Sequence, residues 1–315
     1  MKILFVSDIH INLSKNIEWE KNRVSRLFDI LSKESYDRIV LGGDTFDVAS
    51  PSLEELSLFY QNISKLDKPI VIGGNHENVK SKLTTFDYIP ELGFTYKATD
   101  VLDCGDTDIY LCSHSHMHTL KYVRKVLKDK KNVLFTHIRC NVPPHIKEEY
   151  DVRSLSNAFD LVISGDIHQP YSPYDNVLYP GQPYSVRYNP EVKHQYFILD
   201  TDTLEVERKE LRLPTKIKVT LPINDLTKYP FKKDNLYKVK VRGTIEEIHN
   251  LPTLSSNIVY EKAVVTDSSI EVGTALIDNK VDIVTTLLDT TQAMYSLSDE
   301  VVESGRELLE SIVSK

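Results

Sequence analysis

The stretch KILFVSDIH, residues 2–10, passes from a continuous apolar run directly into an aspartate and a histidine. An uninterrupted apolar run is typical of a strand that is buried on both faces, as in the parallel sheet of an α/β protein. Side chains two residues apart on an extended segment point the same way, so Asp8 and His10 are predicted to bind one metal ion together. The same pattern recurs in DIH at 166–168, which pairs Asp166 with His168.

Similar apolar runs alternate with helical patterns through the first half of the chain. Helices are expected at 18–35, at 52–66 behind Pro51, and near 120–127. Further strands are expected at 38–44, 69–75, 108–114, 132–138 and 160–168, followed by antiparallel strands at 177–183, 194–202 and 204–213. This alternation predicts a layered α/β domain with helices outside a central sheet.

Residue types that bind metals follow five of these apolar runs. They are Asp8 and His10, Asp44, Asn75 and His76, His137, and Asp166 and His168. The carboxyl ends of strands in an open α/β sheet face one crevice, so these side chains are expected to meet. A mixture of carboxylate, imidazole and amide ligands suits manganese, iron or zinc better than calcium. A single Asp or His at a strand end has an ordinary explanation as a turn former, but five such ends are hard to assign to turns alone.

The motifs that carry these residues resemble the signature of the calcineurin-like metallophosphoesterase superfamily. In order they are DIH, GDTFD, GNHE, TH and GDIH, and the resemblance covers roughly residues 1–200. It implies an αββα sandwich. Beyond it, short alternating runs predict a small α+β capping domain, and two helical patterns predict C-terminal helices. The family usually has His where this chain has Asp166, whose charge is expected to tighten the ion and weaken its Lewis acidity.

The same resemblance implies two divalent cations, most simply Mn²⁺, with Mg²⁺ as the alternative. One would be held by Asp8, His10, Asp44 and His168, and the other by Asp44, Asn75, His137 and Asp166, with Asp44 bridging. His76 would be the general acid or the stabiliser of the transition state, and Asp47 would orient it. Such a pair of cations polarises a phosphoryl group and lowers the pKa of a bound water.

Two longer blocks resemble the SbcD-type DNA repair nucleases, known in eukaryotes as the meiotic recombination eleven family. They are GDTFDVASPS at 43–52 and LYPGQPYSVRYNPEVKHQYFILDTD at 178–202, with Gly-Gln-Pro in place of Gly-Ser-Pro. The resemblance implies an exo- or endonuclease that acts at DNA ends in repair and recombination, as a homodimer with an SMC-like coiled-coil ATPase. The short chain and the Asp166 variant suggest a compact, phage-type version.

Three domains follow from this comparison. Residues 1–213 would form the nuclease domain, 214–275 a small capping domain that binds DNA, and 276–315 a helical segment that binds the ATPase. Arg139 and Arg187 lie near motif residues and are candidate contacts to the DNA backbone. Lys121, Arg124, Lys125 and Lys128 form a basic stripe that is better explained as a solvated helix face.

Charge and cysteine content restrict the binding partners and the cellular compartment that the sequence predicts. A net charge of -8 argues against a simple basic DNA-binding surface, but it leaves room for an acidic nuclease site that metal ions neutralise. Three cysteines without a CxxC motif favour a reduced, cytoplasmic setting, either nucleoid-associated or viral in a host cell. The first apolar run is too short for a signal peptide, and no run approaches the roughly 20 residues of a membrane span.

Two other functions fit parts of the sequence. A small-molecule phosphodiesterase or phosphatase would need the same metals, but protein phosphatases typically carry Arg where this chain has Gly74. A non-catalytic scaffold would not need His76 together with all seven ligand positions. The histidines of HSHMH, 114–118, resemble a metal cluster, but no acid lies nearby in sequence, so a metal site is not expected there.

Overall fold

The computed structural model describes residues 1–80, 83–120, 130–140, 149–189, 192–243, 250–251 and 257–264 of the 315-residue chain. The chain divides into two compact units, residues 1–242 with 251–263, and residues 243–250 with 264–315. Almost all described residues belong to the first unit. The predicted helical segment at 276–315 and the basic stripe from Lys121 to Lys128 lie outside the described residues.

The first six-stranded sheet is built around the N-terminal strand β1 (Lys2–Val6). Its order is β14 (Val206–Leu211), β13 (His194–Asp200), β1, β2 (Arg38–Gly42), β3 (Pro69–Ile72) and β6 (Thr95–Tyr96). Strands β1, β2, β3 and β6 are parallel, β13 is antiparallel to β1, and β14 is antiparallel to β13. The continuous apolar run of β1 is buried because strands flank it on both sides and side chains cover both faces.

The second six-stranded sheet contains four neighbouring parallel strands. Its order is β11 (Tyr171–Tyr174), β12 (Val177–Tyr179), β10 (Leu161–Gly165), β9 (Lys131–His137), β8 (Thr107–Cys112) and β7 (Thr99–Asp103). Strands β8, β9, β10 and β12 pair in parallel, so they end at the same edge. The outermost strands, β7 and β11, are antiparallel to their neighbours.

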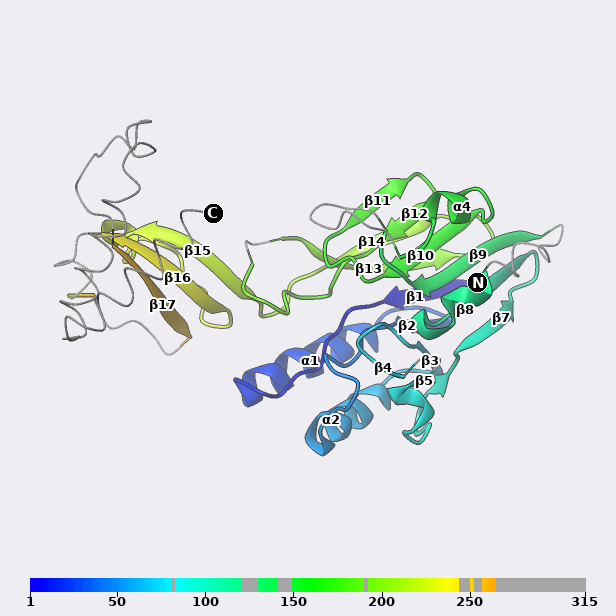
Figure 1. Ribbon diagram of the computed structural model, residues 1–315, viewed down its shortest axis with the longest axis horizontal. Coiled ribbons are helices and arrows are strands. Elements are labelled where there is room, and N and C mark those ends of the chain that lie inside the picture. The colour runs from blue at the N-terminus through cyan, green and yellow to red at the C-terminus, as the bar shows by residue number, and fades with distance from the viewer. Residues whose placement is uncertain are drawn as a thin grey trace, which may run out of the picture. The chain divides into compact units, whose positions relative to one another are not determined.

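The two sheets pack face to face, with helices on their outer faces (Figure 1). Phe5 of the first sheet meets Phe135 of the second at 5.1 Å between ring centroids, within an apolar layer that both sheets share. Helices α1 (Ile17–Leu31) and α2 (Leu53–Ile63) cover the first sheet. The second is covered by α4 (Val152–Ser156) and by η2 (His114–Thr119) with Leu120. The αββα sandwich is therefore confirmed, and the single central sheet expected from the alternation alone is wrong.

A separate three-stranded sheet follows the sandwich in the chain. It consists of β15 (Lys216–Pro222), β16 (Leu236–Gly243) and β17 (Ile258–Val264), with η3 (Ile223–Asp225) after β15. Short elements complete the sandwich: β4 (Asn78–Lys80), β5 (Leu83–Thr84) and η1 (Thr85–Asp87). The domain boundaries at 213 and 275 stay a prediction. None of the helices in the described ranges is long and apolar enough to span a membrane.

Candidate metal centre

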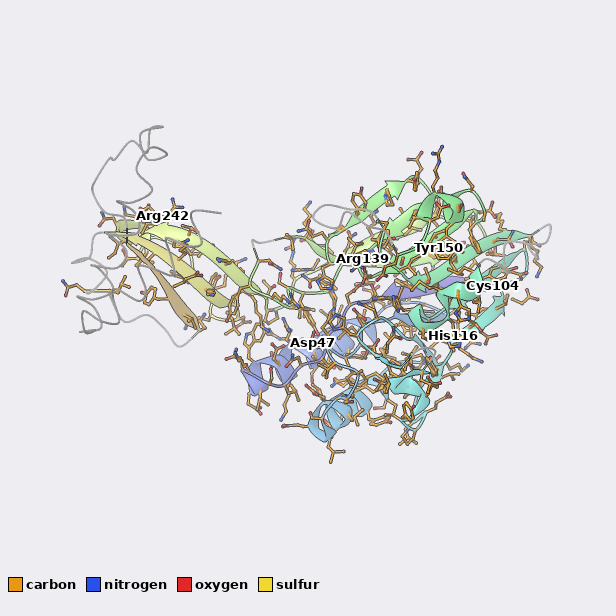
Figure 2. The ribbon with its side chains drawn as sticks, viewed as in Figure 1. Asp47, Cys104, His116, Arg139, Tyr150 and Arg242 are labelled. Carbon is orange, nitrogen blue, oxygen red and sulfur yellow. The ribbon has the colours of Figure 1, made fainter. Side chains whose placement is uncertain are left out.

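The loops that follow β1, β2, β3, β9 and β10 meet at one edge of the sandwich. They bring together imidazole and carboxylate groups in three overlapping sets whose ligand atoms lie within 4.8 Å of one another. These sets are Asp8, His10 and His168; His10, Asp44 and His76; and Asp8, Asp44 and His137. Asp47 and Arg139, labelled in Figure 2, belong to the loops after β2 and β9 and so come from different sheets.

The backbone is left-handed at four of the predicted ligands. Asp8 has φ 59°, His10 φ 49°, Asp44 φ 50° and Asp166 φ 83°. Side chains other than glycine rarely adopt such values, and each costs on the order of 1 kcal/mol, so their concentration here is typical of a functional site. The expectation that Asp8 and His10 share an extended segment is therefore wrong, because the strand ends at Val6 and the chain turns at each of them.

Hydrogen bonds between the loops compensate for this strain. The Asp8 amide donates to the Gly43 carbonyl at 3.0 Å, and the His10 amide donates to the Asp44 carbonyl at 2.9 Å. From the second sheet, the Asp166 amide donates to Asp8 Oδ1 at 3.1 Å. Each loop thus fixes its neighbour.

Glycine is required where these loops approach one another. A Cβ on Gly74 would stand 2.1 Å from Asp44 Oδ1 and 2.4 Å from the Asp44 amide nitrogen. A Cβ on Gly165 would stand 2.4 Å from His137 Nδ1. The absence of a Cβ at these two glycines is therefore what permits the close approach.

The first predicted ligand group gathers around His10. Its Nε2 lies 3.1 Å from His168 Nε2 and 3.5 Å from Asp44 Oδ2. His168 Nε2 lies 3.8 Å from Asp8 Oδ1. His10 Nδ1 contacts Asp47 Oδ1 at 3.1 Å, which directs the lone pair of Nε2 toward the other ligands.

The second predicted group gathers around Asn75 and His137. His137 Nδ1 donates to the Gly42 carbonyl at 2.8 Å, so its Nε2 faces Asp44 Oδ2 at 3.4 Å with a lone pair. The amide group of Asn75 lies 3.1 Å from Asp44 Oδ2, 3.2 Å from His137 Nε2 and 3.3 Å from Asp166 Oδ1, and its nitrogen donates to these atoms when no cation is bound. Rotation of the amide by half a turn presents its oxygen to the same point. Carboxylate, imidazole and amide oxygen then form a donor set that fits a divalent cation.

Asp166 takes part in this group at longer range. Its Oδ1 lies 3.9 Å from His137 Nε2, and its Oδ2 is buried with no hydrogen-bond partner. Burial raises the pKa of Asp166, and the neighbouring charges of Asp8, Glu149 and Asp44 raise it further against the opposing effect of His137. An unpaired buried carboxylate oxygen is costly, and coordination of a cation is one way to satisfy it.

Opposite charges dominate the buried centre. Burial alone would raise the pKa of Asp44, yet His137, His10 and His76 hold it well below its usual range. Burial alone would lower the pKa of His137, yet the carboxylates of Asp44, Asp8 and Asp166 hold it well above its ordinary value. Cation binding replaces these protons, because ligands coordinate in their deprotonated forms.

His76 lies at the more open side of the centre, with 30% of its side chain exposed. Its Nδ1 contacts the backbone carbonyl of Asp47 at 2.7 Å, whereas the Asp47 carboxylate is 3.7 Å away. That carboxylate contacts His10 instead and accepts from Asn12 Nδ2 at 2.6 Å. Asp47 thus touches His76 chiefly through its main chain, and its role in orienting His76 stays a prediction.

Glu77 was not singled out by the sequence, although it is part of the GNHE motif. Its buried carboxylate accepts from the amides of Asp44 at 3.0 Å, Phe46 at 2.7 Å and Gly74 at 2.7 Å. It therefore ties the loop after β2 to the loop after β3. The sequence signal that could have identified Glu77 is its position directly after Asn-His in the motif.

The two candidate DNA contacts differ in their surroundings. Arg187 is exposed on the segment after β12. Arg139 is half-buried, and its Nη2 donates to Glu149 Oε1 at 2.9 Å. Within the described residues, the histidines of HSHMH enter no group of three metal-binding side chains.

Comparison with known proteins places this geometry in context. The family model described as calcineurin-like phosphoesterase matches residues 1–170. The chain is 34% identical over 247 residues to the probable exonuclease subunit 1 of Escherichia phage T5, which covers 70% of this chain and 73% of that protein. It is 23% identical to a subunit of the nuclease SbcCD of Staphylococcus saprophyticus, over 56% of this chain and 59% of that one. It is 26% identical to the DNA double-strand break repair protein Mre11 of Sulfurisphaera tokodaii, over 53% of this chain and 49% of that one.

Proposed function

Because this chain belongs to the calcineurin-like phosphoesterase family and is a phosphodiester hydrolase, we propose that its substrate is DNA, cut at ends by a two-metal nuclease. The observation that carries the proposal is the convergence of acids and histidines from both sheets onto one buried centre. Similarity to three proteins named as nuclease or break-repair proteins supports DNA as the substrate.

The residues that would hold the cations are those of the two groups described above. They are Asp8, His10, Asp44 and His168 for one cation, and Asp44, Asn75, His137 and Asp166 for the other. Divalent cations bound there neutralise phosphate charge and lower the pKa of water, and Mn²⁺ is the proposed ion.

His76 is the proposed proton donor to the leaving oxygen. With Nδ1 held at the Asp47 carbonyl, its Nε2 points toward the centre, 3.9 Å from Asp44 Oδ2. Its partial exposure gives a substrate access to that nitrogen. A proton donor must lie within hydrogen-bond reach of the departing oxygen. The leaving group is therefore expected on the side of the site nearest His76.

The test compares substrates and metals on the purified chain. Linear duplex, hairpin and single-stranded DNA are incubated with Mn²⁺ and then with Mg²⁺, beside a chromogenic phosphodiester. We expect cleavage of DNA that depends on Mn²⁺ and falls by at least a hundredfold in His76→Ala, a loss at the lower end of general acid–base effects. Hydrolysis of the chromogenic diester without cleavage of any DNA would favour a small-molecule phosphodiesterase. Inactivity on every substrate would favour the scaffold.

The partner proposal concerns the C-terminal residues. By resemblance, residues 276–315 would dock on an SMC-like coiled-coil ATPase, with two copies of this chain in the complex, acting in DNA repair and recombination in the cytoplasm. Deletion of the residues after Tyr295 should abolish co-purification with the ATPase and leave hydrolysis of the chromogenic diester unchanged. Unchanged co-purification would contradict this proposal.

A further inference from the structure

The turn that carries Asn75 and His76 is held from two sides. On one side, the Glu77 carboxylate binds the amides of the loop after β2. The turn itself is closed by a hydrogen bond from the Asn78 amide to the Asn75 carbonyl at 3.3 Å. On the other side, the Asn78 side chain reaches away from this loop and meets His114. The position of Asn75 and His76 therefore depends on both anchors.

His114 is fixed at the corner between β8 and η2. Its amide donates to the Gly73 carbonyl at 2.8 Å, and the preceding Ser113 accepts the Gly73 amide through Oγ at 2.8 Å. The backbone of His114 is thus bound to the start of the loop after β3. Only 12% of its side chain is exposed.

Both ring nitrogens of His114 are engaged. Nε2 lies 3.3 Å from Glu149 Oε2, and a carboxylate only accepts, so Nε2 carries the proton. Nδ1 then has a lone pair and accepts from Asn78 Nδ2 at 2.7 Å. A neutral imidazole satisfies both contacts, and the two partners fix the orientation of the ring.

Glu149 extends the connection to the loop after β9. It accepts from Arg139 Nη2 at 2.9 Å and from the Arg139 amide at 3.3 Å, and its own amide donates to the Arg139 carbonyl at 3.1 Å. Arg139 lies two residues beyond His137. The contacts Asn78–His114–Glu149–Arg139 therefore connect the turn of Asn75 and His76 to the loop of His137.

We propose that His114 is a positioning residue for the hydrolysis. Through Asn78 it holds the turn that carries Asn75 and His76, and through Glu149 it keeps this turn at a fixed distance from the loop of His137. This inference rests on the proposed function of the same centre. Removal of a side chain that supports metal ligands in this way typically lowers metal affinity or activity by 10–100-fold.

The test uses four variants and the chromogenic substrate bis(4-nitrophenyl) phosphate with Mn²⁺. His114→Ala should lower kcat about tenfold, with KM within about twofold of wild type, and should weaken Mn²⁺ binding about tenfold. His114→Asn, whose Oδ1 can stand where Nδ1 does, keeps the contact to Asn78 and should recover kcat to within about threefold of wild type. Glu149→Gln removes the charge and should lower kcat about threefold.

His118→Ala is the matched control, because it changes an exposed histidine of the same short helix. It should match wild type in kcat and Mn²⁺ binding. Equal kcat in His114→Ala and His118→Ala, or a His114→Asn protein no better than His114→Ala, would overturn the inference. If His114→Ala does not fold, a Glu149→Gln protein with wild-type kcat overturns it instead. Failure of the wild type to cut DNA refutes the proposed substrate, while the chromogenic assay still decides the role of His114.

Discussion

Glu77 has a fully buried carboxylate whose charge is balanced by backbone amides rather than by a cationic side chain. Burial, followed by the nearby charge of Asp44, raises the pKa of Glu77 to about 7. The folded-state pKa lies above the unfolded value, so its contribution to stability is present at low pH and is lost as pH rises through about 7. Raising the pH of the metal-free protein from 5 to 8 should therefore reduce the free energy of unfolding.

The Glu77→Gln variant isolates this contribution. Between pH 5 and pH 8, wild type should lose about 2 to 3 kcal/mol more than the variant, from 1.36 kcal/mol per pKa unit. Urea denaturation in the presence of a chelator measures both profiles. Parallel profiles would show that Glu77 is ionised throughout this range.

Gly74 permits the contact between the loops after β2 and β3. In Gly74→Ala, the new Cβ would collide with the backbone and the carboxylate of Asp44, so that Asp44 must move. Displacement by about 1 Å near a reacting centre can cost a hundredfold, and we expect at least that loss of phosphodiesterase activity. The control is Gly105→Asn, where nothing lies within 4 Å of the new Cβ and asparagine tolerates the φ of 79°. Similar activity in both variants would contradict the close contact.

At the scale of residues, the sequence predicted which side chains meet but not how they meet. Motif spacing and strand ends were sufficient to bring Asp8, His10, Asp44, His137 and His168 together. The left-handed backbone at Asp8, His10 and Asp44 was not predictable, because each of these three residues has an unstrained alternative in a turn. Glu149 carries no signal in the sequence, since its contact to His114 depends on the packing of segments far apart in the chain.

At the scale of elements, helix α1 contains a buried ionic cluster. Arg23 is 1% exposed, pairs with Glu20, donates to the Ser185 carbonyl at 2.9 Å and lies 3.8 Å from the centre of the Tyr184 ring. Arg23→Met would remove one of two cations beside the buried Glu20 carboxylate, which keeps Lys216 Nζ at 2.6 Å. It would also lose the hydrogen bond to Ser185. We expect a loss of about 2 kcal/mol in the free energy of unfolding, as for other hydrogen bonds to charged groups.

Two comparisons test this prediction by urea denaturation. Adding Glu20→Gln to Arg23→Met should cost less than Glu20→Gln costs in wild type, because the contact between the two side chains is already lost. Arg26→Met changes an arginine of the same helix that is 49% exposed and should cost less than about 1 kcal/mol. A loss in Arg26→Met as large as in Arg23→Met would refute the role of burial.

The long apolar strands and both long helices were predictable from the sequence. Helix α2 begins with a capping box, in which Ser52 accepts from the Glu55 amide and Glu55 accepts from the Ser52 amide. The short strands β4, β5, β6, β7 and β11 were missed, since they span two to five residues without a continuous apolar run. The division of the strands into two sheets could not be predicted from the alternation of strands and helices. Buried parallel strands are continuous apolar runs in either sheet, so the sequence does not show which sheet a strand joins.

At the scale of the whole molecule, the candidate ligands come from both sheets. Asp8, His10 and Asp44 follow strands of the first sheet, whereas His137 ends strand β9 of the second sheet and His168 follows its strand β10. A cation bound between them stabilises the folded protein by mass action. At a free Mn²⁺ concentration one hundred times Kd, the gain is about 2.7 kcal/mol for one site.

Differential scanning calorimetry tests this expectation. Tm should rise with Mn²⁺ concentration and return to its starting value with a chelator. In Asp44→Asn, which loses the shared charge, the rise should be much smaller. A Tm that does not depend on Mn²⁺ would contradict a cation between the sheets.

The left-handed backbone at the acids determines which substitution yields an inert but intact protein. Alanine at Asp8 or Asp44 would impose an unfavourable φ on a residue with no polar side chain to compensate, so lost activity could reflect a distorted loop. Asparagine is far better suited to that φ and keeps the shape of aspartate while removing its charge. Asp44→Asn is therefore the form to crystallise with an uncut oligonucleotide.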